Sequence, residues 1–336
     1  MNQFGGEMEQ VILTGPGHLA SRHVAEPNVA ENEALVRMER IGICGSDFHA
    51  FSGKHPAYLY PRVLGHECAC TVVAVPANER GLKVGDRCAI DPYVNCGACG
   101  MCLAGRTNCC ERLEVLGVHR DGGMQEFMAI PFRLLHPSQK LSLEELALVE
   151  TLGIGAHAVE RSLLRAGESA LVVGAGPIGL ATALFAKVAG AEVVLAEINS
   201  ERRTFAARLG FETAPAVDGT QSSVVYDATG NPIVMANSLK NVAQGGKLVF
   251  VGLTSDPVAL DDSLFHKKEV TLYSSRNSAG QFPRIIGLLE EGTISVKEWV
   301  TNQLSLSEVP ENFSKLSKYP GLIKAIVNIP QSTGRG

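Results

Sequence analysis

Apolar residues in the first part of the chain come in short stretches that turn residues separate. The GPG segment at 15–17 and the GLKVGD segment at 81–86 are typical of tight connections between strands. This pattern predicts a β-rich domain or a small barrel. Its clearest candidate strands are residues 10–13, 34–43, 69–75 and 87–90.

A helical stretch at 143–165 precedes a change of pattern, because short strands and helices alternate from residue 168 onward. The strands of this second part are continuous apolar runs, which is typical of a parallel sheet covered by helices on both faces. The predicted strands are residues 170–173, 192–196, 224–226, 247–251 and 270–274. The predicted helices are residues 180–189, 200–209 and 232–242. The fold class is therefore α/β, with a β-rich domain and a doubly wound parallel sheet.

One connection in the second part departs from this alternation. Residues 211–223 include APAVDGTQSS, which has no helical periodicity, so the crossover between the third and fourth strands is predicted to be short and to lack its helix. After about residue 279 the pattern becomes less regular, with a helix at 283–290 and a strand at 325–329. We place domain boundaries after residue 147 and after residue 279.

Composition narrows the class of protein. A chain of 336 residues, of which 45% are apolar and 19% charged, fits two globular domains. The formal net charge of −5 argues against nucleic acid or an anionic membrane as the main partner. No apolar run reaches the ~20 residues of a membrane-spanning helix, and the N-terminal residues lack the pattern of a secretory signal. We therefore expect a cytoplasmic protein whose nine cysteines are metal ligands or buried thiols.

The segment GAGPIG has the glycine spacing of a dinucleotide-binding turn. Gly174 would make the tight turn, Gly176 would let a pyrophosphate approach the backbone, and Gly179 would let the next helix pack against the strand. Pro177 and Ile178 open that helix, whose N-terminus would face the phosphates. Because the segment also follows a predicted strand, we interpret it as a coenzyme site.

Glu197 ends the next predicted strand, where an acidic residue accepts hydrogen bonds from the adenosine ribose hydroxyls. Its charge would repel a 2′-phosphate, so the sequence favours NAD over NADP. Arg202 and Arg203 follow closely and could accommodate that phosphate, which keeps NADP as the alternative. The alternative interpretation of the two arginines is a solvated helix face.

Four cysteines with the spacing C-x2-C-x2-C-x7-C indicate a structural zinc site. The thiolates of Cys96, Cys99, Cys102 and Cys110 can close a tetrahedron around one ion and leave no open position. Cys109 is an alternative fourth ligand, and an iron–sulfur cluster is an alternative occupant.

A second candidate metal site lies in the segment GICGSDFHAFSGKHPAYLYPRVLGHE. Cys44 follows a predicted strand and is expected in a loop, and His66 and Glu67 follow the apolar segment at 61–64. A thiol, an imidazole and a carboxylate suit a catalytic zinc, which keeps three protein ligands and one open position. The alternative is a buried thiol beside a hydrogen-bonded histidine.

Taken together, these motifs resemble the zinc-dependent medium-chain dehydrogenase/reductase family, and the resemblance runs essentially from end to end. GICGSDFH, VLGHE, the cysteine segment ending in GRTNCC, GVHRDGG, GAGPIG and DATG follow one another in the family's order. YPRVLGHE, GRTNCCE and FHKKEVTLYSSRN are most similar to the branch that contains sorbitol, threonine and L-galactonate 5-dehydrogenases. The resemblance implies a GroES-like catalytic domain at 1–147 with a structural zinc lobe at 92–112, a Rossmann NAD-binding domain at 148–279, and a return to the catalytic domain at 280–336.

The resemblance also implies roles for individual residues. Cys44 and His66 would bind a catalytic zinc, and Asp47 would orient a ligand. Glu150 stands where the alcohol dehydrogenases proper have a cysteine, and it would bind the zinc directly or through water. Glu67 is the alternative carboxylate ligand, and the two carboxylates could exchange on the metal.

The implied reaction is the zinc- and NAD-dependent oxidation of a secondary hydroxyl in a polyol, a sugar acid such as L-galactonate, or a similar small alcohol. Ser46 and His49 would pass the hydroxyl proton to solvent, and Thr229, Val251 and Leu253 would line the coenzyme. Two alternatives remain: a zinc-independent quinone-type reductase on the same fold, and a non-enzymatic NAD-binding redox sensor.

Family habit implies a homodimer or homotetramer, joined through an edge strand at 269–274. The partner is expected to be a small hydroxylated substrate rather than a nucleic acid or a membrane. Polar and aromatic candidates for its pocket are Phe51, His55, Tyr58, His119, Arg120 and Arg276.

Overall fold

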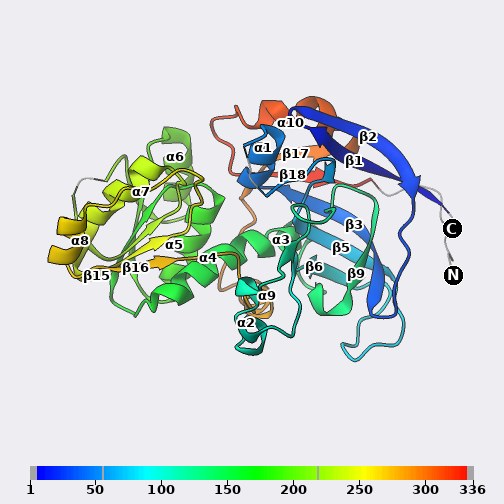
Figure 1. Cartoon of the computed structure of the whole chain (residues 1–336), viewed down its shortest axis with the longest axis horizontal. Helices are drawn as coiled ribbons and strands as arrows, with labels where there is room; N and C mark the ends of the chain where they lie inside the picture. Colours follow the sequence, from blue (N-terminus) through cyan, green and yellow to red (C-terminus); the bar gives the residue numbers. More distant parts are fainter. Residues whose placement is uncertain (1–5, 55–56, 218, 331–336) are drawn as a thin grey trace. The chain divides into compact units, whose positions relative to one another are not determined.

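The computed structural model describes residues 6–54, 57–217 and 219–330. Two compact units make up the chain (Figure 1). The first unit is formed by Met1–Glu150 together with Phe282–Gly336, and the second unit by Thr151–Gln281. The last segment of the chain therefore folds with the first segment, and the second unit is inserted between them.

The second unit contains a six-stranded sheet in which all neighbouring strands are parallel. Its strands are β11 (Ser169–Val173), β12 (Glu192–Ala196), β13 (Glu212–Ala214), β14 (Ser222–Asp227), β15 (Val242–Phe250) and β16 (Thr271–Ser274). Their order, β13-β12-β11-β14-β15-β16, is that of a doubly wound dinucleotide-binding fold, in which the strand order reverses direction at β11. The predicted α/β class with a Rossmann sheet is confirmed.

Helices connect these strands and cover the sheet. They are α4 (Val149–Ser162), α5 (Pro177–Val188), α6 (Ser200–Arg208), α7 (Pro232–Ser238), the 3-10 helix Leu239–Asn241, and α8 (Asp262–Lys267). On β11, Leu171 and Val173 pack into an apolar cluster on one face, and Ala170 and Val172 are also buried. Burial of both sets explains why the strands of this unit read as continuous apolar runs.

The connection between β13 and β14 contains no helix in its described residues, 215–217 and 219–221. The predicted short crossover is therefore confirmed. A stretch without an apolar face could not bury a helix against the sheet, which is the physical reason for the shortened connection.

The predicted helical stretch at 143–165 is helical over most of its length, but the structure divides it into two helices and ends the second at Ser162. Helix α3 (Leu143–Ala147) and helix α4 are separated by Leu148, whose N–H is shared between the carbonyl oxygens of Glu144 and Glu145 at 3.2 Å each. Such a shared bond tightens the last turn of a helix. Ser142 and Glu145 form a capping box at the start of α3, which fixes its N-terminus.

The first unit is built around a seven-stranded sheet with the order β10-β6-β5-β3-β18-β17, and β9 also pairs with β3. These strands are β3 (Glu33–Ile43), β5 (Glu67–Ala74), β6 (Arg87–Ile90), β9 (Phe127–Pro131), β10 (Leu135–Pro137), β17 (Val300–Ser305) and β18 (Lys324–Asn328). The C-terminal strand β18 pairs antiparallel with β3, so residues from both ends of the sequence meet in the middle of this sheet.

Smaller elements complete the first unit. A three-stranded sheet contains β1 (Glu7–Gly15), β2 (His18–Ala25) and β4 (Arg62–Val63), and a two-stranded sheet contains β7 (Tyr93–Val94) and β8 (Glu114–Val115). The helices are α1 (Gly45–Phe51), α2 (Gly100–Leu103), α9 (Phe282–Glu290) and α10 (Val309–Leu316). The 3-10 helices are Thr107–Cys109, Phe132–Leu134 and Leu306–Glu308.

Cys44 lies in the connection between β3 and α1, as expected, but it also caps α1, a short helix that the sequence pattern does not predict. The helix was missed because it is short and begins with glycine, which is a poor helix former. Asp47 explains the helix start, because its carboxylate accepts a hydrogen bond from the Cys44 backbone N–H at 2.9 Å.

In the part of the chain that the structure describes, there is no helix whose length and hydrophobicity would suffice to cross a membrane.

Candidate functional site

The first unit brings three potential metal ligands together. Cys44 follows β3 directly, and His66 and Glu67 stand at the start of β5, which pairs with β3. One ligand atom from each of these three side chains lies within 4.8 Å of the other two. The strand pairing thus gathers a thiol, an imidazole and a carboxylate at one place.

Glu67 is held by a lysine from the C-terminal strand. Both Glu67 carboxylate oxygens accept hydrogen bonds from Lys324 Nζ, at 2.6 and 2.7 Å, and both side chains are almost fully buried. Gly42 lies opposite Glu67 on β3, and a Cβ at this position would overlap the carboxylate. A glycine is therefore required to make room for this ion pair.

Asp47 lies behind the same group and is fully buried. Its Oδ2 accepts the Cys44 N–H, and its Oδ1 is 3.8 Å from His66 Nδ1. Burial raises the pKa of Asp47, whereas the charge of His66 opposes the shift. Burial disfavours a charged His66, but the negative charges of Cys44 and Asp47 outweigh it and raise the pKa of His66 well above its ordinary value. Such a concentration of negative groups favours a bound cation.

Glu150 is buried near this group, although it lies outside the set of three whose ligand atoms share the 4.8 Å limit. Its Oε1 accepts a hydrogen bond from the hydroxyl of Tyr93. Burial, together with the charge of Glu67, raises the pKa of Glu150 to about 7, and the charge of His66 acts in the opposite direction. Besides Asp47, the site therefore contains two glutamate carboxylates in different surroundings, one paired with a lysine and the other with a phenol.

The two residues predicted to carry a proton both lie on α1. Ser46 is half-buried and His49 is exposed, and they are one helical turn apart. The buried hydroxyl of Tyr58 lies close to Ser46 and Asp47, and burial raises the pKa of Tyr58. The helix thus places the serine nearer to the ligand group and the histidine at the surface.

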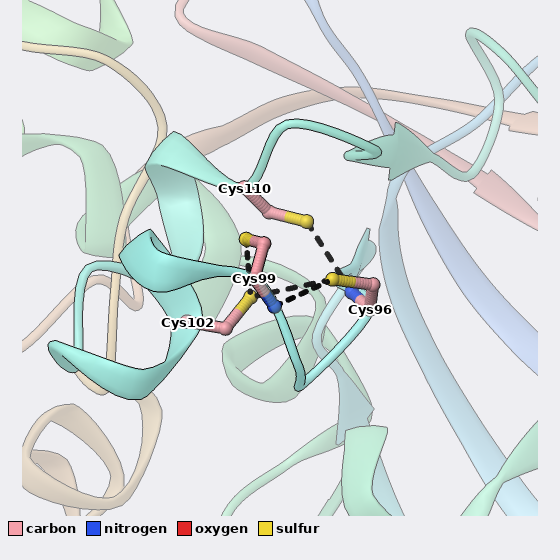
Figure 2. A group of neighbouring side chains, drawn as sticks. All are labelled: Cys96, Cys99, Cys102 and Cys110. Carbon is pink, nitrogen blue, oxygen red and sulfur yellow. Dashed lines mark hydrogen bonds between the residues drawn. The ribbon is translucent and has the colours of Figure 1, made fainter.

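The four predicted structural ligands form a second cluster (Figure 2). Cys96 Sγ is 3.9 Å from Cys102 Sγ, and Cys99 Sγ is 3.6 Å from Cys102 Sγ. Four sulfurs at Zn–S distances of ~2.3 Å around one tetrahedral ion would be about 3.8 Å apart, so the observed spacing fits zinc. Cys110 completes the cluster, and its sulfur accepts the Cys96 N–H at 3.3 Å.

The cysteines of this cluster differ in how readily they lose the thiol proton. The N–H groups of Ala98 and Cys99 lower the pKa of Cys96 to about 6. In contrast, desolvation and the neighbouring Cys99 raise the pKa of Cys102 to about 12. Cys109, the alternative fourth ligand, is not a member of the cluster, and its sulfur instead accepts a hydrogen bond from Arg106 at 3.7 Å.

In the second unit, GAGPIG forms the turn between β11 and α5. Gly174 has φ +96°, a left-handed conformation that favours glycine, and a Cβ at Gly179 would overlap the Gly174 carbonyl oxygen. Gly176 caps α5, and Pro177 and Ile178 are its first two residues. The turn thus brings the backbone and the N-terminus of α5 to the carboxyl edge of the sheet, where open α/β sheets bind ligands.

Glu197 follows β12 and is tied to this turn. Its carboxylate accepts hydrogen bonds from the N–H groups of Ala175 and Asn199, at 2.8 Å each. Arg202 Nη1 would lie 3.9 Å from a Cβ built on Gly176, and Arg202 Nε is buried without a hydrogen-bond partner in the described structure. Arg203 instead donates to the Glu197 carbonyl oxygen at 2.8 Å. Of the two arginines, Arg202 is the one aimed at the glycine turn.

The remaining predicted coenzyme residues follow β14 and β15 at the same edge of the sheet. Thr229 is bound to the Asp227 carboxylate through its N–H and its hydroxyl, and its methyl group would be 3.3 Å from a Cβ on Gly174. Val251 is nearly buried, and Leu253 is 80% exposed. An exposed leucine at this edge is available for contact with a ligand.

The prediction from the sequence did not include two residues of the metal site, Lys324 and Tyr93. Lys324 was missed because a lysine at the start of an apolar strand ordinarily lies at the surface, and its partner Glu67 is 257 residues away. Tyr93 was missed because no local motif links it to Glu150. His55, one of the candidate pocket residues, lies outside the described residues.

Comparison with known proteins places the chain in a family. The alcohol dehydrogenase GroES-like domain matches residues 30–140, and the zinc-binding dehydrogenase family matches residues 177–291. An L-galactonate-5-dehydrogenase of Escherichia coli K12 is 38% identical, with 92% of this chain and 95% of the relative covered. A sorbitol dehydrogenase of Bacillus subtilis strain 168 is 31% identical, with 93% and 94% covered.

A solved structure is similar over nearly the whole chain. It is described as a short chain alcohol dehydrogenase from E. coli CFT073 complexed with NADH, and it has a TM-score of 0.91, 28% identity, and coverage of 96% of this chain and 100% of the other. Full-length similarity of this kind, with family matches in both units, shows that the chain belongs to the zinc-type alcohol dehydrogenases of the medium-chain dehydrogenase/reductase family.

Proposed function

We propose that this protein is a zinc- and NAD-dependent dehydrogenase that oxidises a secondary hydroxyl of a polyol or sugar acid. The group of half-buried Cys44 with buried His66 and Glu67, and with Glu150 close by, is the observation that carries the proposal. Sulfur, nitrogen and oxygen donors in one place fit zinc, and a set of three ligands leaves a position for substrate. The four-cysteine cluster has no such vacancy and would hold a second, structural zinc.

Glu150 is the better candidate for the third ligand of the catalytic zinc. The charge of Glu67 is already compensated by Lys324 through both carboxylate oxygens. Among the described residues Glu150 forms no salt bridge, although the charges of His66 and Lys324 act on it, and its Oε1 accepts the Tyr93 hydroxyl. A bound metal ion would therefore gain more electrostatic stabilisation from Glu150, and Glu67 would remain paired with Lys324.

Each residue of the site has a role that its surroundings support. When bound, zinc supplies Lewis acidity towards a substrate hydroxyl, and the nicotinamide accepts the hydride. Asp47, through its approach to His66 Nδ1, orients the imidazole so that Nε2 is left for the metal. The Ser46 hydroxyl would accept the substrate proton while giving up its own proton, and His49 at the exposed end of the helical turn would carry a proton from this relay to solvent.

The coenzyme residues favour NAD. The buried Glu197 carboxylate at the end of β12 places a negative charge beside the glycine turn, and this charge disfavours a 2′-phosphate. Arg202 faces the same turn and would contact the pyrophosphate or the adenosine. Thr229, Val251 and Leu253 complete the edge along which the coenzyme would lie.

The substrate class is suggested by the relatives. They include an L-galactonate-5-dehydrogenase and a sorbitol dehydrogenase, so the protein is an oxidoreductase acting on polyol-type alcohols. Within that class we propose a sugar acid such as L-galactonate, because the relative that carries this name shares the higher identity, 38%.

A coenzyme-reduction assay tests this proposal. The zinc-loaded protein is assayed with NAD and with NADP on L-galactonate, sorbitol, threonine and simple alcohols, and the absorbance of the reduced coenzyme is followed. We expect turnover with NAD that is highest on the sugar acid. Fully zinc-loaded protein that turns over none of these substrates would contradict the proposed function.

A further inference from the structure

Tyr93 joins the four-cysteine lobe to the catalytic ligand group. It lies on β7, which pairs with β8 through Tyr93 and Val115, and the chain between these two strands carries Cys96 to Cys110. The two strands therefore form the base of the lobe, and Tyr93 is on the strand that leads into it.

The backbone at this base is fixed on both sides of Tyr93. Its N–H donates to Asp91 Oδ1 at 3.0 Å, and its carbonyl oxygen accepts the Asn95 N–H at 3.0 Å. Asn95 is in turn held by Arg133, which donates to the Asn95 carbonyl oxygen at 2.8 Å. Closing the four-cysteine cluster around an ion would further restrain this segment, because metal binding fixes the loop that supplies the ligands.

The side chain of Tyr93 makes its hydrogen bond with Glu150, a residue outside the four-cysteine lobe. The residue is only 4% exposed, and its hydroxyl donates to Glu150 Oε1, which is buried to the same degree. One carboxylate oxygen of Glu150 is therefore engaged by the phenol, and Oε2 is left for a cation. A carboxylate fixed in this way is pre-oriented as a metal ligand.

We propose that Tyr93 is a positioning residue, which sets the Glu150 carboxylate for the catalytic metal from a strand anchored at the base of the four-cysteine lobe. The inference rests on the proposed function, specifically on Glu150 as a zinc ligand. Removal of the hydroxyl leaves the ring in place but frees Glu150 to rotate. Loss of a partner behind a metal ligand ordinarily lowers metal affinity by roughly 10- to 100-fold.

The test is a zinc-chelator competition on the full-length protein. The catalytic zinc is identified as the ion that the wild type binds and the Cys44→Ser variant does not. For Tyr93→Phe we expect this ion to bind roughly 10- to 100-fold more weakly, with the lobe zinc unchanged. The matched control is Tyr226→Phe, because Tyr226 is also buried and its hydroxyl lies 2.6 Å from Ser162 Oγ in the second unit. This control should retain both zinc ions with wild-type affinity.

A double-mutant cycle with Glu150→Gln tests whether Tyr93 influences zinc affinity through Glu150. If Tyr93 acts through Glu150, Tyr93→Phe should weaken zinc binding in the wild-type background and have almost no further effect in Glu150→Gln. Unchanged zinc affinity in Tyr93→Phe, or an equal loss in both backgrounds, would overturn the inference. If Cys44→Ser loses no zinc relative to the wild type, the proposed function itself is contradicted. The failure of the inference and the failure of the proposed function are therefore distinguishable.

Discussion

Lys324 and Glu67 form a buried ion pair beside the metal ligands, and its two members come from opposite ends of the sequence. Removing water from two charges is costly, and the mutual attraction offsets this cost only while both partners are present. Gly42 supplies the space for the carboxylate. At the scale of single residues, the site thus depends on charge compensation as much as on its ligands.

Loss of one member of this pair should destabilise the first unit. We expect Lys324→Met to lower the free energy of unfolding by about 3–5 kcal/mol, because it leaves a buried carboxylate without a partner. Urea denaturation, followed by the fluorescence of the chain's one tryptophan, Trp299, measures the effect, since this residue is buried in the first unit. The double variant Glu67→Gln/Lys324→Met should recover most of the loss, and an equally unstable double variant would contradict this account.

The raised pKa of Glu150 gives zinc binding at the catalytic site a defined pH dependence. The metal needs the ionised carboxylate, and burial keeps Glu150 protonated up to a pKa of about 7. Protons therefore compete with the metal increasingly as the pH falls through 7, and affinity should rise between about pH 6 and 8. Chelator competition at several pH values measures this slope. It should become shallower in Glu150→Gln, and an unchanged slope in that variant would contradict the assignment.

At the scale of elements, the glycine turn between β11 and α5 allows a close packing contact that a side chain would prevent. The close approach of Gly179 to the Gly174 carbonyl oxygen lets α5 begin directly beside the strand. Any Cβ at Gly179 would push the helix start away from the sheet and would disturb the coenzyme edge.

We expect Gly179→Ala to lower the stability of the second unit by about 1–3 kcal/mol and to weaken NADH binding, because overpacking must move backbone rather than a flexible side chain. A fluorescence titration of NADH measures the binding. The control is Gly287→Ala in α9, where an added Cβ meets no atom within 4 Å. Similar NADH affinity in the Gly179 variant and this control would contradict the structural reading of the turn.

Elements with a strong local pattern could be predicted from the sequence. The parallel strands, the GAGPIG turn and the short crossover all have local signals in apolar runs or glycine spacing, and so do the four cysteines. Helix α1 and strand β2 lack such signals: α1 is short and starts at Gly45, and β2 is mostly exposed. The partners of Glu67 and Glu150 depend on tertiary pairing between distant segments, which no local pattern encodes.

At the scale of the whole molecule, the candidate metal ligands and the candidate coenzyme residues belong to different units. The candidate metal ligands all belong to the first unit, and the glycine turn with Glu197 belongs to the second. Glu150 is the last residue of the first unit before the chain enters the second, and it already lies in helix α4. The chain returns to the first unit at Phe282, and this return supplies Lys324.

The most direct test of the metal site compares the zinc content and the NAD-dependent turnover of the wild type with those of Cys44→Ser. Elemental analysis of the purified proteins counts the ions per chain, and the coenzyme-reduction assay gives the rate. We predict two zinc ions per wild-type chain, and for Cys44→Ser one retained lobe zinc, normal NADH binding and no turnover. A Cys44→Ser protein that keeps both ions, or that oxidises the substrate at the wild-type rate, would contradict the catalytic role of this site.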